Sequence, residues 1–140
     1  MTDEDRSTTG ASQYLLVLRI AERRRSGPVP PGDVAAAVDR SPSATTEMLQ
    51  RLEERNLVSY EPYDGARLTT EGREAVEELF ETYVTLAVFF RDVLDLDDFE
   101  AEALRVAGAI SPAVADRLAS TLPLETASSS DDDRPVPSPL

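Results

Sequence analysis

The sequence contains neither cysteine nor histidine. The absence of cysteine excludes disulfide bonds, zinc ribbons and thiol chemistry. The absence of both residues leaves borderline transition metals without their usual nitrogen and sulfur ligands, so that only oxygen ligands remain. It also excludes a Ser-His-Asp triad and a Cys-His pair. We therefore expect a protein that is not an enzyme.

Long apolar runs are absent as well. No segment approaches the roughly 18 to 20 uncharged apolar residues that a membrane span needs. The acidic beginning of the chain, Met1-Thr2-Asp3-Glu4-Asp5, is not followed by the apolar core of a signal peptide. We expect a cytoplasmic protein with no membrane partner. A length of 140 residues suits one compact unit that gains stability from dimerisation.

Lysine is missing too, since all 14 basic residues are arginine, against 27 acidic residues and a net charge of −13. DNA-binding proteins usually show the opposite balance. The acid is concentrated in the second half: residues 1–70 carry 11 acidic residues and 9 arginines, whereas residues 71–140 carry 16 and 5. A halophilic origin would explain an acidic DNA-binding protein, because counterion release contributes little in very high salt. A mildly acidic protein with a disordered tail is the alternative.

The apolar periodicity and the turn residues predict a mainly α fold with one small hairpin. Helices are expected over residues 11–25, 33–38, 41–55, 98–110 and 111–122, with a long helix from residue 70 and two strands at 57–61 and 66–69. This order predicts a winged helix-turn-helix DNA-binding domain over residues 11–70, followed by a helical dimerisation domain over residues 71–122. Residues 1–10 and the acidic tail 123–140 are expected to be disordered.

The helix that begins after Ser41-Pro42 is the candidate recognition helix. Serine caps a helix and proline fits its first position. In a helix-turn-helix, the second helix enters the major groove and presents short polar side chains to base edges. Met48, Leu49 and Leu52 are expected to pack inward. The predicted DNA-contacting residues are Arg40, Ser41, Ser43, Thr46, Glu47, Gln50 and Arg51, together with Arg67 on the wing. An ordinary amphipathic helix with a solvated hydroxyl face is the alternative.

Several segments resemble one known family. The segment from Ser41 to Leu52, followed by Asn56-Leu57-Val58, is similar to the recognition helix of the metalloregulators named after the diphtheria toxin repressor and the manganese transport regulator. Residues 60–72 resemble the wing and the start of the linking helix of that family, and residues 93–97 and 109–118 resemble its dimerisation region. The similarity covers roughly Gln13 to Leu122, without a counterpart of the optional SH3-like third domain.

The resemblance implies a homodimer that binds a palindromic operator in double-stranded DNA. The C-terminal helices would form the interface between the two subunits. The predicted dimerisation residues lie on the apolar ridge of the long helix and are Tyr83, Leu86, Phe89 and Phe90.

The resemblance also implies a site for Mn²⁺ or Fe²⁺ between the first helix, the long helix and the helix after it. The sequence departs from the family pattern there. The positions that align with the family's ligands are Gln13, Leu16, Tyr83, Leu104, Ala107 and Gly108. Mostly apolar side chains cannot replace imidazole and carboxylate ligands. No cofactor is therefore predicted, and Leu16, Tyr83 and Leu104 are expected to fill the former cavity as core.

Four alternatives stay open at this point. Glu78, Glu81 and Glu102, with Glu100 nearby, could hold a hard cation as non-standard ligands of a metal-dependent repressor. A small apolar effector could take the place of the metal. The regulator could bind DNA constitutively, with regulation by protein level or by heterodimerisation with a metal-sensing relative. Finally, the same fold could serve as a protein-interaction module, a hypothesis that the net charge of −13 favours.

Overall fold

The computed structural model describes residues 2–122, so the predicted disordered tail 123–140 lies outside the described residues. The chain divides into two compact units between Glu78 and Leu79. This boundary lies inside helix α4 (Thr70–Asp92), eight residues after the start of the predicted dimerisation domain at residue 71. Each unit is described by itself.

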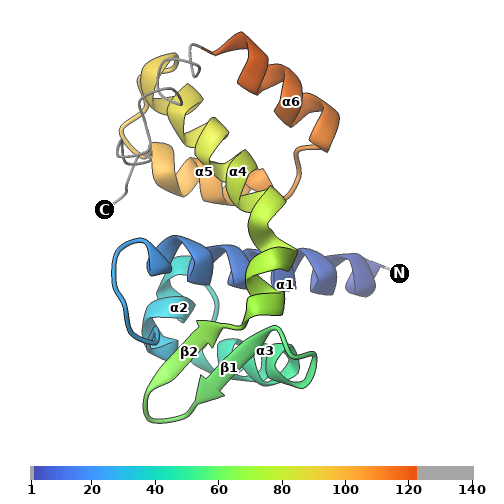
Figure 1. Ribbon diagram of the computed structural model, residues 1–140, viewed down its shortest axis with the longest axis vertical. Coiled ribbons are helices and arrows are strands. Elements are labelled where there is room, and N and C mark those ends of the chain that lie inside the picture. The colour runs from blue at the N-terminus through green and yellow to red at the C-terminus, as the bar shows by residue number, and fades with distance from the viewer. Residues whose placement is uncertain (1, 123–140) are drawn as a thin grey trace. The chain divides into compact units, whose positions relative to one another are not determined.

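The first unit has the element order of a winged helix-turn-helix (Figure 1). Helix α1 packs against α2 and α3, α2 packs against α3, and α3 packs against strand β1. The mainly α fold class and the winged helix-turn-helix predicted from the sequence are thereby confirmed. The elements are α1 (Thr2–Glu22), α2 (Pro31–Val38), α3 (Pro42–Glu54), β1 (Val58–Glu61), β2 (Gly65–Leu68) and the first turns of α4.

Helix α1 starts earlier than the sequence analysis predicts. It begins at Thr2 rather than at Ala11, so the expected disorder of residues 1–10 is corrected to helix for residues 2–10. No proline interrupts residues 2–22, and the single glycine among them is Gly10. One glycine costs a helix about 1 kcal/mol, which the remaining turns can offset. The polar composition that suggested disorder does not by itself prevent helix formation.

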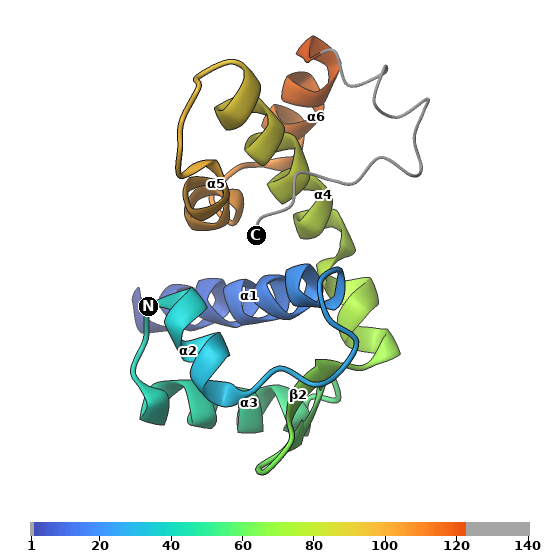
Figure 2. The same ribbon diagram turned by 90° about the vertical axis from the view of Figure 1, so that its left-hand side faces the viewer.

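The core of the first unit lies between α1, α2, α3 and the wing. Figure 1 and Figure 2 both show α1 running across α2 and α3. Leu16 and Leu18 of α1 are each 1% exposed, and Leu49 and Leu52 of α3 are fully buried. Truncation of such leucines typically costs about 2–5 kcal/mol, so this layer fixes the position of α3. The other buried apolar residues of this core include Tyr14, Val34, Val38, Val58, Ala66, Leu68 and Val76.

The wing is an antiparallel hairpin held at its base by the segment before α2. Strands β1 and β2 pair Val58 with Leu68 and Glu61 with Gly65. The amide of Val29 donates to the Ala66 carbonyl oxygen at 2.8 Å, and the amide of Ala66 donates back at 2.9 Å. Gly65 has a φ of +125°, and a Cβ at this position would clash with the Val29 carbonyl. Glycine is therefore required where the hairpin crosses this segment.

The second unit contains the rest of α4, α5 (Phe99–Ala107) and α6 (Pro112–Thr121). Phe80, Val88 and Ala103 are among its buried side chains, and the rings of Phe80 and Tyr83 stack with centroids 6.2 Å apart. Ser111 caps α6 by accepting a hydrogen bond from the Val114 amide at 3.3 Å. No residue of α6 is fully buried within the chain. None of the helices within residues 2–122 is both long and apolar enough to cross a membrane.

Two successive hydrogen bonds join the segment after α3 to the start of α4. Asn56 adopts a left-handed backbone with a φ of 64°, and its carbonyl oxygen accepts a hydrogen bond from the Thr69 hydroxyl at 2.8 Å. The Thr69 hydroxyl oxygen accepts in turn from the Gly72 amide at 3.0 Å, which caps the start of α4. Gly72 is buried, and a Cβ there would clash with the Leu57 carbonyl oxygen.

We expect Gly72→Ala to destabilise the first unit by roughly 1–3 kcal/mol, because the added methyl group forces the start of α4 away from Leu57, which lies between α3 and β1. The measurement is the free energy of unfolding in urea. Gly32→Ala is the matched control: Gly32 lies in the first turn of α2 with no atom within 4 Å of an added Cβ. This control should be neutral or stabilising by up to about 1 kcal/mol. Equal stability of the two variants would contradict the close packing at Gly72.

Candidate nucleic-acid interface

Helix α3 begins with the cap predicted from the sequence. Ser41 precedes the helix with extended backbone angles, and its Oγ accepts a hydrogen bond from the Ala44 amide at 3.1 Å. Pro42 occupies the first turn, where a missing amide hydrogen costs nothing. Ser41 thus has a structural role as the helix cap besides its predicted role in DNA contact. Its hydroxyl hydrogen remains available for donation.

One face of α3 is buried and the opposite face is exposed. Leu49 and Leu52 are fully buried, as predicted, whereas Met48 is only half-buried. On the outer face, Ser43, Glu47 and Gln50 follow one another at spacings of four and three residues, which aligns them on a helix. Of the eight predicted DNA-contacting residues, Thr46 is half-buried and the other seven are exposed. The exposed residues are Arg40, Ser41, Ser43, Glu47, Gln50, Arg51 and Arg67.

Thr45 was not singled out by the sequence analysis, although it is a fully buried polar residue of α3. Its hydroxyl lies 3.4 Å from the hydroxyl of Tyr14, which is itself only 3% exposed. A buried hydroxyl without a partner would be destabilising by about 1–3 kcal/mol. The pair therefore joins α1 to α3 by a polar contact inside the core. The serines and threonines of this segment suggested that its hydroxyl groups face outward. Thr45 and Thr46 are neighbours in the sequence, but the rotation of the helix buries Thr45 and leaves Thr46 half-buried.

Arg67 lies on the outward face of the wing. It pairs across the hairpin with Ser59, and both residues are exposed, while their neighbours Val58 and Leu68 are buried. The alternation of a strand thus directs Arg67 away from the core. Residues 58–68 carry no other basic residue.

The three arginines of the predicted interface are free of ion pairs within the described part of the chain. Among the described residues, Arg40, Arg51 and Arg67 have no carboxylate within ion-pair distance, and all three are exposed. By contrast, Arg19, Arg25, Arg73, Arg91 and Arg105 each form an ion pair. An unpaired guanidinium can bind a phosphate without first giving up an internal partner. The eight predicted residues include three arginines and one glutamate, which gives them a net charge of +2 in a chain of net charge −13.

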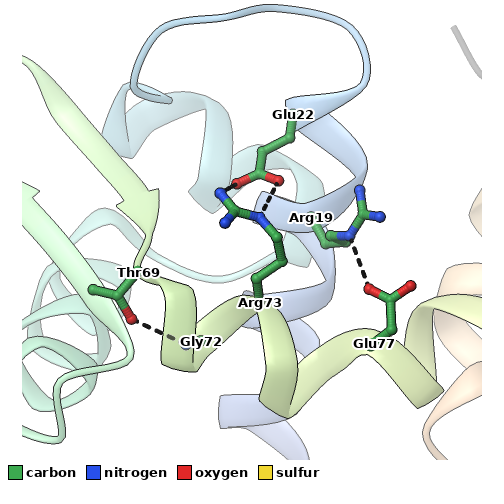
Figure 3. A network of polar contacts seen from close by, with 6 residues as sticks. All are labelled: Arg19, Glu22, Thr69, Gly72, Arg73 and Glu77. Atoms are coloured by element: carbon green, nitrogen blue, oxygen red, sulfur yellow. Dashed lines mark hydrogen bonds and ion pairs between the residues drawn. The ribbon is translucent and has the colours of Figure 1, made fainter.

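A polar network attaches the start of α4 to α1 within the first unit (Figure 3). Arg73 donates to both carboxylate oxygens of Glu22, at 3.2 and 2.9 Å. Arg19 donates to Glu77 at 3.4 Å. The hydrogen bond and the negative charge of Glu22 raise the pKa of Arg73 above its ordinary value. These ion pairs connect the first turns of the long helix to the DNA-binding unit.

The positions that align with the family's metal ligands do not fit a transition metal. Leu16, Tyr83 and Ala107 are buried, with exposures of 1%, 3% and 1%. Gln13 and Leu104 are half-buried, and Gly108 is exposed. Only Gln13 and Tyr83 carry a polar side-chain atom, and neither is a carboxylate, imidazole or thiolate, which Mn²⁺ and Fe²⁺ sites require.

Glu78, Glu81 and Glu102 are the alternative carboxylate ligands that the sequence suggests. Across residues 2–122, no group of three or more acidic side chains is placed so that it could hold an ion. Glu102 instead pairs with Arg105, one turn farther along α5, at 3.5 Å. The role of Glu78, Glu81 and Glu102 as metal ligands stays a prediction.

The predicted dimerisation residues fall into two groups. Tyr83 and Leu86 are each 3% exposed, so their side chains are already covered within one chain. Phe89 and Phe90 are half-buried, with ring centroids 6.0 Å apart. The role of all four in dimerisation stays a prediction, and only the two phenylalanines offer surface to a partner.

Comparisons with known proteins agree with this architecture. Residues 8–66 match the family described as iron dependent repressor, N-terminal DNA binding domain. The chain is 30% identical over 107 residues to an uncharacterised HTH-type transcriptional regulator of Methanocaldococcus jannaschii, an alignment that covers 75% of this chain and 86% of that protein. A helix-turn-helix with a wing and these relatives define a DNA-binding transcriptional regulator. The chain belongs to the DtxR/MntR family, as the sequence resemblance indicated.

Solved structures of regulators share the fold. A manganese-dependent transcriptional repressor in complex with manganese is 26% identical with a TM-score of 0.66, and covers 81% of this chain. The manganese regulator SloR is 23% identical with a TM-score of 0.60, and covers 79% of this chain. In both cases the match covers 52% of the other chain, so this chain spans about half the length of the solved regulators.

We expect Arg73→Gln to lower the free energy of unfolding by about 0.2–1 kcal/mol, the usual contribution of an exposed ion pair. The loss should shrink when salt rises from about 0.1 M to about 1 M, because the Debye length falls from about 10 Å to about 3 Å. Arg24→Gln is the matched control, since Arg24 is exposed and has no ion pair among the described residues. A loss that persists unchanged in high salt would instead indicate packing of the aliphatic part of Arg73.

Proposed function

We propose that the protein is a sequence-specific transcriptional regulator that binds a palindromic operator as a homodimer, without Mn²⁺ or Fe²⁺ at the family's usual site. The observation that carries this proposal is the outer side of α3, where Gln50 is exposed and Thr46 is half-buried. Arg40 just before the helix and Arg51 within it are exposed and carry no ion pair among the described residues. Short polar side chains can hydrogen-bond to base edges, and arginines can bind the flanking phosphates.

The charge distribution supports DNA as the partner of this face. The contacts of Arg40, Arg51 and Arg67 with phosphates would release counterions, and each contributes about 0.9 to the slope of log K against log salt. Glu47 lies on the same face, and its negative charge would repel a phosphate. Its carboxylate can, however, accept a hydrogen bond from the amino group of cytosine. The positive charge is thus local, and the acidic surface elsewhere disfavours nonspecific attachment.

The apolar surface of the second unit supports the homodimer. Ala113, Val114, Arg117, Leu118 and Thr121 of α6 line an open apolar groove of about 340 Å³. Val114 is 48% exposed, and Val93, Leu94 and Leu96 between α4 and α5 are 54%, 47% and 38% exposed. Burial of such side chains against a second copy would stabilise the pair by about 25 cal/mol per Å² of apolar surface.

The side chains at the positions that align with the family's metal ligands support DNA binding without metal. No step of metal binding can be assigned to Leu16, Ala107 or Leu104, because these side chains offer no ligand atom. The names of two solved relatives include manganese. Metal-dependent DNA binding is therefore the second candidate function, and the first experiment includes metal for this reason.

The first experiment selects binding sites from a random-sequence duplex library with purified protein, in the presence and absence of Mn²⁺ and Fe²⁺. We expect one palindromic site with the same affinity in all conditions. Selection that requires metal would overturn the metal-independent mechanism. The absence of any selected site would favour the protein-interaction module instead.

The second experiment separates base contacts from phosphate contacts. Thr46→Ala and Gln50→Ala should each reduce discrimination between the selected site and its mismatched variants by about 1–3 kcal/mol per lost contact. Arg67→Ala should weaken binding to all sequences about equally and lower the salt slope by about 1. Arg24→Ala, a change of an exposed arginine outside the proposed interface, is the control. Unchanged site preference in Gln50→Ala and Thr46→Ala would contradict the assignment of α3 as the recognition helix.

A further inference from the structure

Three exposed arginines of the first unit form no ion pair among the described residues, although carboxylates lie near them in the sequence. Arg51 lies one turn after Glu47 on α3, a spacing at which opposite charges can pair, and no ion pair joins them. Arg40 precedes the helix, and Arg67 lies on β2. We call Arg40, Arg51 and Arg67 the arginine set. Their charge has no ion-pair partner within the described part of the chain.

The sequence that follows the described residues carries the opposite charge. Residues 123–140 contain four side-chain carboxylates and one arginine, a net charge of −3. Three of these carboxylates are consecutive, and we call Asp131, Asp132 and Asp133 the acidic run. An extended chain places successive residues at most about 3.3–3.6 Å apart, and each strand of DNA carries one negative charge per about 3.4 Å of helix axis. The acidic run can therefore offer arginines a charge density similar to that of a DNA strand.

The acidic run is joined to the second unit by a segment long enough to span a domain. Leu122, the last described residue, is 4% exposed, so the point where this segment starts is anchored in the second unit. Eight residues, 123–130, separate Leu122 from Asp131. They can bridge up to about 30 Å, which is about the diameter of a small domain. A group tethered in this way acts at an effective concentration on the order of millimolar, so even a weak contact would be populated.

The turn after α1 is the other arginine-rich place in the first unit. Arg23 and Arg24 are exposed and have no ion pair among the described residues. Arg25, the next residue, already pairs with Asp33 of α2 at 3.2 Å. This turn therefore offers a carboxylate segment less unpaired charge than the arginine set does, and it serves as the competing site in the test.

We propose that the acidic run binds the arginine set and competes with DNA for it. This inference rests on the proposed function, because it concerns the same arginines that would bind phosphates. Operator binding would then exchange one group of ion pairs for another. The displaced carboxylates would regain counterions, so the slope of log K against log salt would be smaller than three arginine–phosphate contacts imply. DNA that binds through phosphates alone would gain little by this exchange, whereas a site whose bases contact α3 would displace the acidic run.

The first test measures the affinity of the full chain for the duplex site selected with wild-type protein. The tail variant, Asp131→Asn with Asp132→Asn and Asp133→Asn, should bind about tenfold more tightly at about 0.1 M salt. This factor is expected when a competitor with a Kd of roughly 0.1 mM is present at a roughly millimolar effective concentration. The slope of log K against log salt should steepen by about 1–3, since each arginine that the tail releases contributes about 0.9.

The matched control removes three carboxylates elsewhere in the chain, through Glu74→Gln, Asp95→Asn and Asp97→Asn. All three side chains are exposed and form no ion pair among the described residues. The control changes the net charge by the same amount as the tail variant, and it should retain the affinity and the salt slope of the wild type. An equal gain in affinity in both variants would assign the effect to net charge and would overturn the proposal.

The second test needs no DNA. A synthetic peptide of residues 123–140 is titrated against the full chain that carries the tail variant, and binding in the range of 0.1 mM is expected at about 0.1 M salt. Two further changes are compared in this background, and their thermal unfolding midpoints verify that the fold is unchanged. Replacement of the arginine set by glutamine should weaken peptide binding at least tenfold, whereas Arg23→Gln with Arg24→Gln should leave it unchanged.

Two results of the peptide titration would overturn the proposal while leaving the proposed function intact. Absence of binding would exclude a contact of the acidic run with the chain. Loss of binding in Arg23→Gln with Arg24→Gln, but not in the arginine-set variant, would place the contact on the turn after α1. If the wild type selected no DNA site, the proposed function would fail, and this titration would still decide whether the acidic run binds the arginine set.

Discussion

The rotation of α3 about its own axis is the constraint on which the candidate interface depends. Leu49 and Leu52 are fully buried at a spacing of three residues, and Thr45 is buried one turn before them. The hydroxyl contact between Thr45 and Tyr14 adds a directional restraint to the apolar packing of α3. A helix held at three consecutive turns cannot rotate without exposing leucine or burying glutamate. The exposed polar face is thus a consequence of what lies beneath it.

Ion pairs within the chain limit which arginines are available to bind a phosphate. Ion pairs with neighbouring carboxylates occupy Arg19, Arg73 and Arg91, and the hydrogen bond from Arg91 lowers the pKa of Asp92 below its ordinary value. The arginines beside α3 and on the wing lack such partners within the described part of the chain. Other exposed arginines, such as Arg24 and Arg55, also lack an ion pair among the described residues, so the place of Arg40, Arg51 and Arg67 beside α3 and on the wing is what sets them apart. Net charge therefore describes the solubility of the molecule better than it describes the chemistry of one face.

Sequence reasoning predicted the order of the elements because caps, turns and apolar spacing are local signals. Ser41-Pro42 marked the start of α3 correctly, and Asp64-Gly65 marked the turn of the wing. The early start of α1 was missed because polar composition was interpreted as disorder, although nothing in residues 2–9 breaks a helix. The burial of Thr45 and the division of α4 after Glu78 depend on contacts between distant segments, which composition and periodicity do not encode.

Three of the positions that align with the family's metal ligands carry buried side chains in this chain. Leu16, Tyr83 and Ala107 are buried to within a few percent of full burial, so each position now contributes to apolar packing. Return of a histidine or carboxylate at one such position would bury a polar group without its partners, at a cost of about 1–3 kcal/mol. A metal site needs several ligands at once, and every single step toward it is destabilising.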